Sequence, residues 1–290
     1  MNGPLLVASD FSEAARRAVE RTAQLAEALG MPAEVQHVVD HGALERLAEL
    51  LLGRQPGLRQ RLLDDAREEL AALCAQVGSR RLASHLAEGE VIEQILARAD
   101  ALDARLLVVG ATGAGHSRLG ATTERLMQSC ARPLLAVRQP ASGAYRRVLV
   151  PVDFSARARP TLEAARALAP EAQLVLLHAY EIPFEQRLQR AGLGDEARAA
   201  LLLDLQARAA ERLARLAADA GLDALRTERI LLHGDPGRRI LEQQPARQCD
   251  LVVLGKRRLG RAEAWLLGSV TQHVLAHADC DVLVLPLTAD

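Results

Sequence analysis

The chain repeats itself, and this internal repeat constrains its fold more than any other feature of the sequence. The segment Leu5–Ser12 (LLVASDFS) recurs as Val148–Ser155 (VLVPVDFS). Later in each half, Ala104–Gly110 recurs as Cys249–Gly255. Matching segments in the same order indicate two copies of one structural unit, because self-similarity along a chain is the signature of a repeated architecture.

The boundary between the copies is predicted at Gln139–Ala144, a stretch with proline, glycine and serine and no apolar period. The chain has 290 residues, which is enough for two domains, because one domain usually takes about 100–200 residues. We therefore expect an N-terminal domain over residues 1–140 and a C-terminal domain over residues 145–290.

Short apolar runs alternate with longer segments of helical period in both halves. Runs such as Leu106–Val109 and Leu251–Leu254 are apolar throughout, which is typical of parallel strands covered on both faces. The alternation predicts an α/β protein of two tandem Rossmann-like, doubly wound domains, each a five-stranded parallel sheet with helices on both faces. The predicted strands are 4–9, 33–39, 81–86, 105–109 and 134–138, and then 147–152, 173–179, 228–233, 250–254 and 282–286.

Composition argues against several classes of partner. The net charge is −1, from 36 basic and 37 acidic residues, and aromatic residues make up 2%, so neither nucleic acid nor a membrane is an expected partner. No apolar stretch approaches the ~18 residues of a membrane span, and no signal peptide is predicted. The four cysteines are scattered without a C-x-x-C pair, which favours a reducing compartment. We therefore expect a cytoplasmic protein.

The candidate site follows from the predicted sheet. In an open parallel sheet, ligands bind beyond the carboxyl ends of the strands, where the strand order reverses. If the first strand of each half neighbours the fourth, Asp10 lies beside Gly110, and Asp153 lies beside Gly255. The serine two positions after each aspartate is expected to cap the following helix.

These residues resemble the universal stress protein family. The resemblance rests on an aspartate after the first strand, a glycine-rich turn after the fourth and Gly-Ser at the start of the last helix, and it covers the whole chain twice, as in the tandem branch of the family. Nucleotide-binding members carry G-x2-G-x9-G-[S/T]. The resemblance implies binding of ATP, with no metal beyond a nucleotide-bound Mg. The aspartate would hold the adenosine end, and glycine amides with a helix N-terminus would hold the phosphates.

The C-terminal half is the better match, since the spacing from Gly255 to Gly268 has the full family length. It departs at Arg258, which stands where the family has its second glycine and which either fills the phosphate space or binds a phosphate. Lys256 beside it is predicted to line a polyphosphate site or to form a solvated basic turn. The predicted nucleotide-binding residues of this half are Pro151, Val152, Asp153, Ala179, Leu254, Gly255, Arg258, Gly268, Ser269, Val270 and Thr271.

The N-terminal half departs differently. Only six residues separate Gly113 from Gly120, and Ala121 replaces the serine or threonine of the motif. We therefore predict a degenerate nucleotide site in this half. Its residues are Asp10, Val38, Gly110, Gly113, Gly120 and Thr122.

The remaining polar candidates favour no catalytic or metal chemistry. His273 and His277 are spaced i, i+4 but lack a third ligand, so no metal site is predicted. His37 and His178 occupy equivalent positions and are interpreted as structural. Neither aspartate has a nucleophile or an acid partner in its motif, so no enzyme is predicted, although weak ATP hydrolysis stays open.

Together these features predict a stress-response protein that binds ATP or another adenine nucleotide, chiefly in its C-terminal domain. It would act as a regulatory or interaction module on an unidentified protein partner. The last strands of the two halves, 134–138 and 282–286, are expected to pair within one chain as a pseudo-dimer, and a further homodimer stays open.

Two alternatives to this function stay open. One is a nucleotide-free scaffold, because both motifs are imperfect. The other is a carrier of an apolar small molecule, held by the leucine-rich insertions after the second strand of each half. The leucines are Leu44, Leu47, Leu50, Leu51, Leu52, Leu62 and Leu63 in one half, and Leu188, Leu193, Leu201, Leu202, Leu203 and Leu205 in the other.

Overall fold

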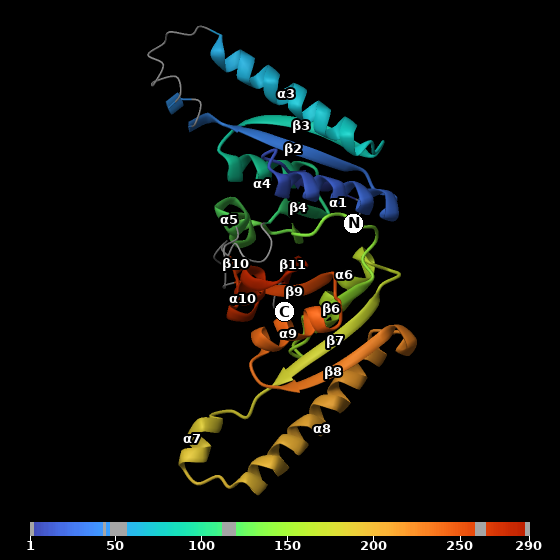
Figure 1. The fold of residues 1–290 in the computed structure, drawn as a ribbon, viewed down its shortest axis with the longest axis vertical. Coiled ribbons are helices and arrows are strands. Elements are labelled where there is room, and N and C mark those ends of the chain that lie inside the picture. Colours follow the sequence, from blue (N-terminus) through green and yellow to red (C-terminus); the bar gives the residue numbers. More distant parts are fainter. Residues whose placement is uncertain (1–2, 43–44, 47–56, 112–119, 259–264, 288–290) are drawn as a thin grey trace. The chain divides into compact units, whose positions relative to one another are not determined.

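The computed structural model describes residues 3–42, 45–46, 57–111, 120–258 and 265–287. The chain divides into two compact units, Met1–Ala144 with Leu259–Leu266, and Tyr145–Arg258 with Leu267–Asp290. These are named the N-terminal unit and the C-terminal unit, and Figure 1 labels their elements.

The N-terminal unit alternates strands with helices. Its elements are β1 (Leu5–Ala8), α1 (Glu13–Leu29), β2 (Ala33–Asp40), α3 (Leu58–Val77), β3 (Leu82–Gly89), α4 (Val91–Ala101), β4 (Leu106–Gly110), α5 (Ala121–Ser129) and β5 (Leu134–Val137), with the short strand β10 (Trp265–Leu266). The five main strands are parallel, in the order β3-β2-β1-β4-β5. Strand order therefore reverses between β1 and β4, where Ala8 is paired with Val109.

The C-terminal unit repeats this plan. Its elements are β6 (Arg147–Pro151), α6 (Ala158–Leu168), β7 (Gln173–Tyr180), α7 (Glu185–Arg190), α8 (Asp195–Asp219), the short 3₁₀ helix η1 (Ala224–Arg226), β8 (Thr227–His233), α9 (Pro236–Ala246), β9 (Leu251–Arg258), α10 (Ser269–His277) and β11 (Asp281–Leu287). Its strands are parallel in the order β11-β9-β6-β7-β8. The switch in strand order lies between β6 and β9.

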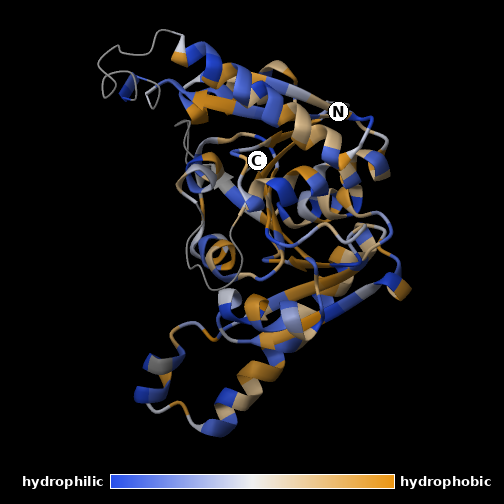
Figure 2. Cartoon of the chain, turned by 45° about the horizontal axis from the view of Figure 1, so that its top comes forward, coloured by the Kyte–Doolittle hydropathy of each residue, from blue (hydrophilic) through white to orange (hydrophobic). Residues whose placement is uncertain are grey.

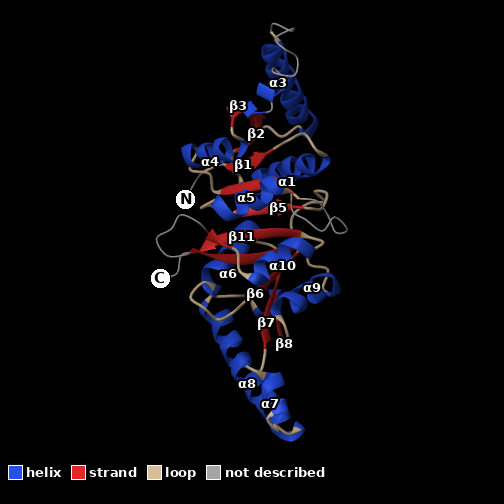
Figure 3. Ribbon diagram, turned by 90° about the vertical axis from the view of Figure 1, so that its left-hand side faces the viewer, coloured by secondary structure: helices blue, strands red, loops and turns tan. Residues whose placement is uncertain are grey.

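Helices cover both faces of each sheet (Figure 3). In the N-terminal unit, α1 and α3 pack against each other and against the sheet, and α4 packs with α5 in a second group. In the C-terminal unit, α6 and α8 contact the strands on one side, where Arg166 Nη1 donates to the Ala220 carbonyl at the end of α8 at 3.1 Å. The helices α9 and α10 form the other group. The predicted fold class is therefore confirmed.

The core of each unit consists of its central strands, which Figure 2 colours mostly as hydrophobic. Every residue of β5 is 0% exposed, and Leu106–Val109 in β4 is at most 4% exposed. Each buried leucine or valine stabilises the fold by about 1.5–3 kcal/mol relative to an exposed one. The uninterrupted apolar runs of the sequence thus form strands because both of their faces are covered.

One strand differs from its prediction. β9 continues past Leu254 to Arg258, because the neighbouring β11 extends to Leu287 and pairs with it along its whole length. The predicted basic turn is therefore wrong, since Lys256 lies inside this strand and its side chain is 1% exposed. In the N-terminal unit, the equivalent strand β4 ends at Gly110.

The leucine-rich insertions are only partly described. Residues 43–44 and 47–56, with most of the leucines of the first insertion, lie outside the described residues. In the second insertion, Leu203 on α8 is 67% exposed and Phe184 before α7 is 72% exposed.

None of the helices in the described ranges is both long and apolar enough to span a membrane. All four cysteines carry free thiols.

Candidate functional site

Asp10 lies at the switch point of the N-terminal unit, in a sharp turn just after β1. The next residue, Phe11, has a φ of 62°, a left-handed conformation that is uncommon for a bulky residue. The carboxylate of Asp10 stabilises the turn by accepting a hydrogen bond from Ser12 N at 3.0 Å. The Ser12 hydroxyl then accepts from Ala15 N at 3.2 Å and caps α1, as predicted.

His37 holds this turn from the neighbouring strand β2. Its Nδ1 lies 2.8 Å from the carbonyl oxygen of Ser9, which assigns a donating Nδ1–H to the ring. Its ring stacks on Phe11, with the ring centroids 4.2 Å apart. The structural interpretation of His37 agrees with these contacts, because both of them position the turn that carries Asp10.

A cavity of about 210 Å³ lies at this switch point. Four of the predicted residues line it, namely Asp10, Val38, Gly110 and Thr122. Further lining residues come from β1 and the turn after it, from β2, β4, α1 and α4, and from the start of α5. They are Ala8, Ser9, Ser12, Ala15, Gln36, His37, Val91, Ile95, Val109 and Thr123. The predicted Gly113 lies outside the described residues.

The start of α5 faces the same region. Its N-cap is Gly120, which has no side chain to cap the helix. The first amides of a helix attract anions, and an uncapped N-terminus leaves them open to a ligand. Thr123, two residues into the helix, donates its hydroxyl to the Gly110 carbonyl at 3.1 Å and is 5% exposed. The sequence offered both Thr122 and Thr123 as substitutes for the missing motif hydroxyl. Only Thr122 was placed in the predicted set, although Thr271, the counterpart of Thr123, was in the set of the other half.

The two described glycines of this motif, Gly110 and Gly120, have different surroundings. A Cβ on Gly110 would lie 2.4 Å from the Ala14 backbone carbon, so glycine allows α1 to approach β4 closely. A Cβ on Gly120 would meet no heavy atom of the described residues within 4 Å. Gly110 is therefore required by the packing of α1 on β4, whereas no described residue packs closely against Gly120.

The C-terminal unit builds the same frame around Asp153. Phe154 has a φ of 56°, and its ring centroid lies 4.2 Å from that of His178. His178 Nδ1 lies 2.8 Å from the Val152 carbonyl oxygen. Thr271 donates to the Gly255 carbonyl at 3.2 Å, as Thr123 does to Gly110. Backbone and histidine geometry are therefore shared by the two halves.

The carboxylate of Asp153 is engaged more fully than that of Asp10. It accepts hydrogen bonds from both the amide and the hydroxyl of Ser155, at 3.0 and 2.6 Å, and its Oδ2 lies 3.5 Å from Arg157 Nη2. The predicted N-cap at Ser155 is wrong, because its hydroxyl is bound to Asp153 and α6 begins only at Ala158.

Helix α8 brings a further cation to this site. The guanidinium carbon of Arg212 lies 4.4 Å from the Phe154 ring centroid, a cation–π contact. Burial lowers the pKa of His178 below its ordinary value of 6.5, and the charge of Arg212 lowers it further. Sequence reasoning missed Arg212, because it lies in the insertion and its sequence carries no motif.

The other predicted residues of the C-terminal half surround the same end of the sheet. Pro151 ends β6, and Val152 follows it with 6% exposure. Ala179 lies in β7, and Leu254 and Gly255 lie in β9. Gly268 is the N-cap of α10, which also has no side-chain cap and begins with Ser269, Val270 and Thr271. Arg258 ends β9, and its side chain lies outside the described part of the chain.

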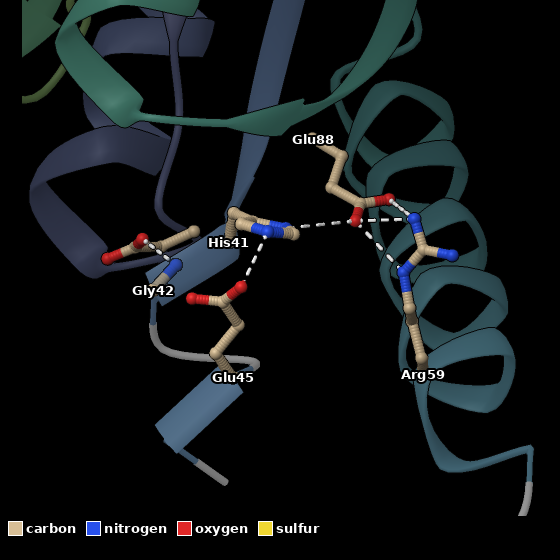
Figure 4. A network of polar contacts seen from close by, with 6 residues as sticks. His41, Gly42, Glu45, Arg59 and Glu88 are labelled. Carbon is tan, nitrogen blue, oxygen red and sulfur yellow. Dashed lines mark hydrogen bonds and ion pairs between the residues drawn. The ribbon is translucent and has the colours of Figure 1, made fainter. Parts of the chain in front are cut away.

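A polar cluster that was not predicted lies at the ends of β2 and β3 (Figure 4). Glu88 binds Arg59 at 2.6 Å and lies 3.6 Å from His41 Nδ1, while Glu45 lies 3.0 Å from His41 Nε2. The hydrogen bond from Arg59 lowers the pKa of Glu88. These surface pairs join α3 to the end of the sheet, and solvent screening keeps their contribution to stability small.

Metal-ligating side chains do not gather anywhere in the described ranges, where no group of three or more His, Cys, Asp or Glu residues could hold an ion. His273 and His277 are neighbours on α10, with ring centroids 4.6 Å apart, and His277 Nδ1 bonds to the His273 carbonyl at 2.9 Å. That contact is made within the helix.

Comparisons with known proteins agree with the repeat. The model of the universal stress protein family matches residues 1–138 and again 144–286. A universal stress protein of Thermus aquaticus is 31% identical over 151 residues, which cover 49% of this chain and 98% of the relative. Another, from Synechocystis, is 32% identical over 151 residues, with 49% and 97% coverage. Each relative therefore corresponds to half of this chain.

Solved structures show the same fold over the whole length. A universal stress protein of Archaeoglobus fulgidus has a TM-score of 0.69 at 17% identity and covers 98% of both chains. A Pseudomonas aeruginosa protein described as functionally unknown has a TM-score of 0.66 at 16% identity, with coverage of 99% of this chain and 92% of that one. The α/β fold of this chain is thus shared with these proteins over nearly its whole length.

Proposed function

Because this chain belongs to the universal stress protein family as a tandem of two such domains, we propose that it binds ATP or a related adenine nucleotide. The nucleotide regulates the contacts of the protein with a partner and is not turned over. A ligand shifts such contacts only if it binds two states with different affinity. The observation that carries the proposal is the cavity at the N-terminal switch point, where Asp10, Val38, Gly110 and Thr122 meet.

The cavity suits the nucleoside end of such a ligand. Its volume of about 210 Å³ is below the ~300 Å³ at which pockets for whole drug-sized ligands begin, so it fits one part of a nucleotide. Apolar side chains of Val38, Val91 and Ile95 suit the faces of a base. The exposed Asp10 carboxylate accepts hydrogen bonds from ribose hydroxyls, and the uncapped start of α5 attracts phosphate.

We place the stronger site in the N-terminal unit, which reverses the order that the glycine spacing suggests. Asp10 receives one hydrogen bond from the described residues, from Ser12 N. Asp153 is bound by Ser155 and paired with Arg157, so a ligand must compete with contacts inside the chain. This observation favours the second candidate, a nucleotide-free scaffold role, for the C-terminal unit.

Isothermal titration calorimetry of the purified full chain with ATP tests the proposal. Asp10→Ala and Gly120→Val remove an acceptor and fill the space at the start of α5, and each is expected to weaken binding at least about tenfold, the loss of roughly 1.4 kcal/mol. The matched changes Asp153→Ala and Gly268→Val are expected to have smaller effects. The proposal fails if binding does not saturate, or if both N-terminal variants bind ATP like the wild type.

A further inference from the structure

Gln36 is a buried polar residue that the fold does not explain. It lies in β2, is 1% exposed and lines the N-terminal cavity. Its side-chain Nε2 donates to the Gln94 carbonyl of α4 at 3.2 Å. This contact directs the side chain to the face of the sheet where Val91 and Ile95, also on α4, line the cavity.

The other end of the Gln36 amide has no partner. Its Oε1 is fully buried, and none of the groups described in the structure donates a hydrogen bond to it. A buried acceptor left unsatisfied costs about 1–3 kcal/mol, and the large majority of buried polar atoms in proteins are paired. The bond from Nε2 to Gln94 also settles which end of the amide is the oxygen. A group that enters the cavity with an N–H would satisfy this acceptor.

The C-terminal unit shows that the fold does not require glutamine here. The equivalent residue is Leu177, because Leu177 O accepts from Val152 N at 2.8 Å just as Gln36 O accepts from Ser9 N at 2.9 Å. Leu177 is also 1% exposed. The same buried backbone position thus carries an apolar side chain in one unit and a hydrogen-bonding one in the other.

We infer that Gln36 determines the specificity of the N-terminal site by accepting a hydrogen bond from an amino group on a nucleobase. This inference rests on the proposed function, since it assumes that the base enters the cavity. The base lies against the apolar side chains of Val91 and Ile95, and its amino edge points to Gln36 Oε1. A base with a carbonyl at that edge places one oxygen against another and leaves both acceptors unsatisfied.

Adenine and hypoxanthine form the matched probe, because the amino group of one is replaced by a carbonyl in the other. The dissociation constants of ATP and inosine triphosphate are measured for the wild type and for Gln36→Leu, which installs the residue of the other half. The wild type is expected to prefer ATP by about tenfold, the effect of one unsatisfied buried acceptor. In Gln36→Leu, the ratio of the two constants is expected to fall towards one.

The ratio separates this inference from general damage to the site, which weakens both ligands equally. Circular dichroism checks folding, and Gln36→Met, which keeps the length of the side chain, replaces Gln36→Leu if that variant does not fold. Leu177→Met is the control in the other half and should leave the ratio unchanged. If the wild type binds no ATP, the proposed function fails and this inference with it. If ATP binding depends on Asp10 and Gly120 while Gln36→Leu keeps the wild-type ratio, only this inference is overturned.

Discussion

The two units of this chain share one backbone frame but surround its aspartate with different side chains. In both, an aspartate and a left-handed phenylalanine follow the first strand, and a histidine from the second strand binds the carbonyl before them. In the N-terminal unit, the Asp10 carboxylate lines a cavity with Gln36 on its wall. In the C-terminal unit, Ser155 and Arg157 bind the Asp153 carboxylate, and Leu177 replaces the glutamine.

This difference shows that two units with the same backbone fold can place different side chains around the equivalent aspartate. Both turns share the amide hydrogen bond to the aspartate and the histidine contact with the preceding carbonyl. The availability of each carboxylate instead depends on side chains one turn away, such as Arg157, and these can change without disturbing the sheet. A duplicated domain can thus keep its fold while one copy changes its chemistry.

The largest expected effect concerns Gly110, where the glycine motif is part of the packing. Gly110→Ala places a Cβ 2.4 Å from the Ala14 backbone, and neither backbone can move without separating α1 from β4. Overpacking of this kind costs about 2–3 kcal/mol. Urea unfolding followed by circular dichroism should show an earlier transition than in the wild type.

Gly120→Ala is the control for that change, because its Cβ meets no heavy atom of the described residues within 4 Å. It should unfold at nearly the urea concentration of the wild type. Equal destabilisation by the two substitutions would contradict the distinction between Gly110, which is tightly packed against α1, and Gly120, which is not.

A medium effect is expected at the threonine that each unit uses to tie its last helix to the end of its fourth strand. Thr123→Val and Thr271→Val keep the shape of the side chain but lose the hydrogen bond to Gly110 or Gly255. Each is expected to lower the free energy of unfolding by about 1 kcal/mol. Clearly unequal losses would show that the frames of the two units are not equivalent, and Thr122→Val, at an exposed neighbouring position, should change little.

The smallest effect is the pH dependence of the C-terminal unit. The pKa of His178 is lowered in the folded protein from its ordinary value of 6.5, so below that pH the unfolded chain takes up a proton more readily than the folded one. The contribution of the neutral His178 ring to the free energy of unfolding is fully present above pH 6.5. It is lost as the pH falls through the lower pKa of the folded state. Urea unfolding between about pH 7.5 and about pH 5.5, a range about one unit either side of an ordinary histidine, should show this slope, and His178→Asn should reduce it. An unchanged slope in the variant would exclude His178 as its source.

Much of the architecture was predictable because it depends on patterns that are local or repeated. Continuous apolar runs marked the strands, and the duplicated segments marked the two domains. The position of Asp10 beside Gly110 followed from strand order alone. The extension of β9 through Lys256 could not be predicted, because it depends on pairing with β11, which is distant in the sequence.

The amino-acid sequence by itself determined the family, the repeated α/β fold and the glycines and aspartates of both switch points, since these follow from apolar period and motif spacing. Only the tertiary structure decided that the Asp153 carboxylate is bound by its neighbours and that Gly110 is tightly packed while Gly120 has no close contact among the described residues. It also decided that Gln36, which lines a cavity, carries a buried acceptor without a partner. The physical reason is that hydrogen-bond partners and empty space are set by residues brought together from different strands and helices. Neither quantity is encoded in the spacing of neighbouring residues.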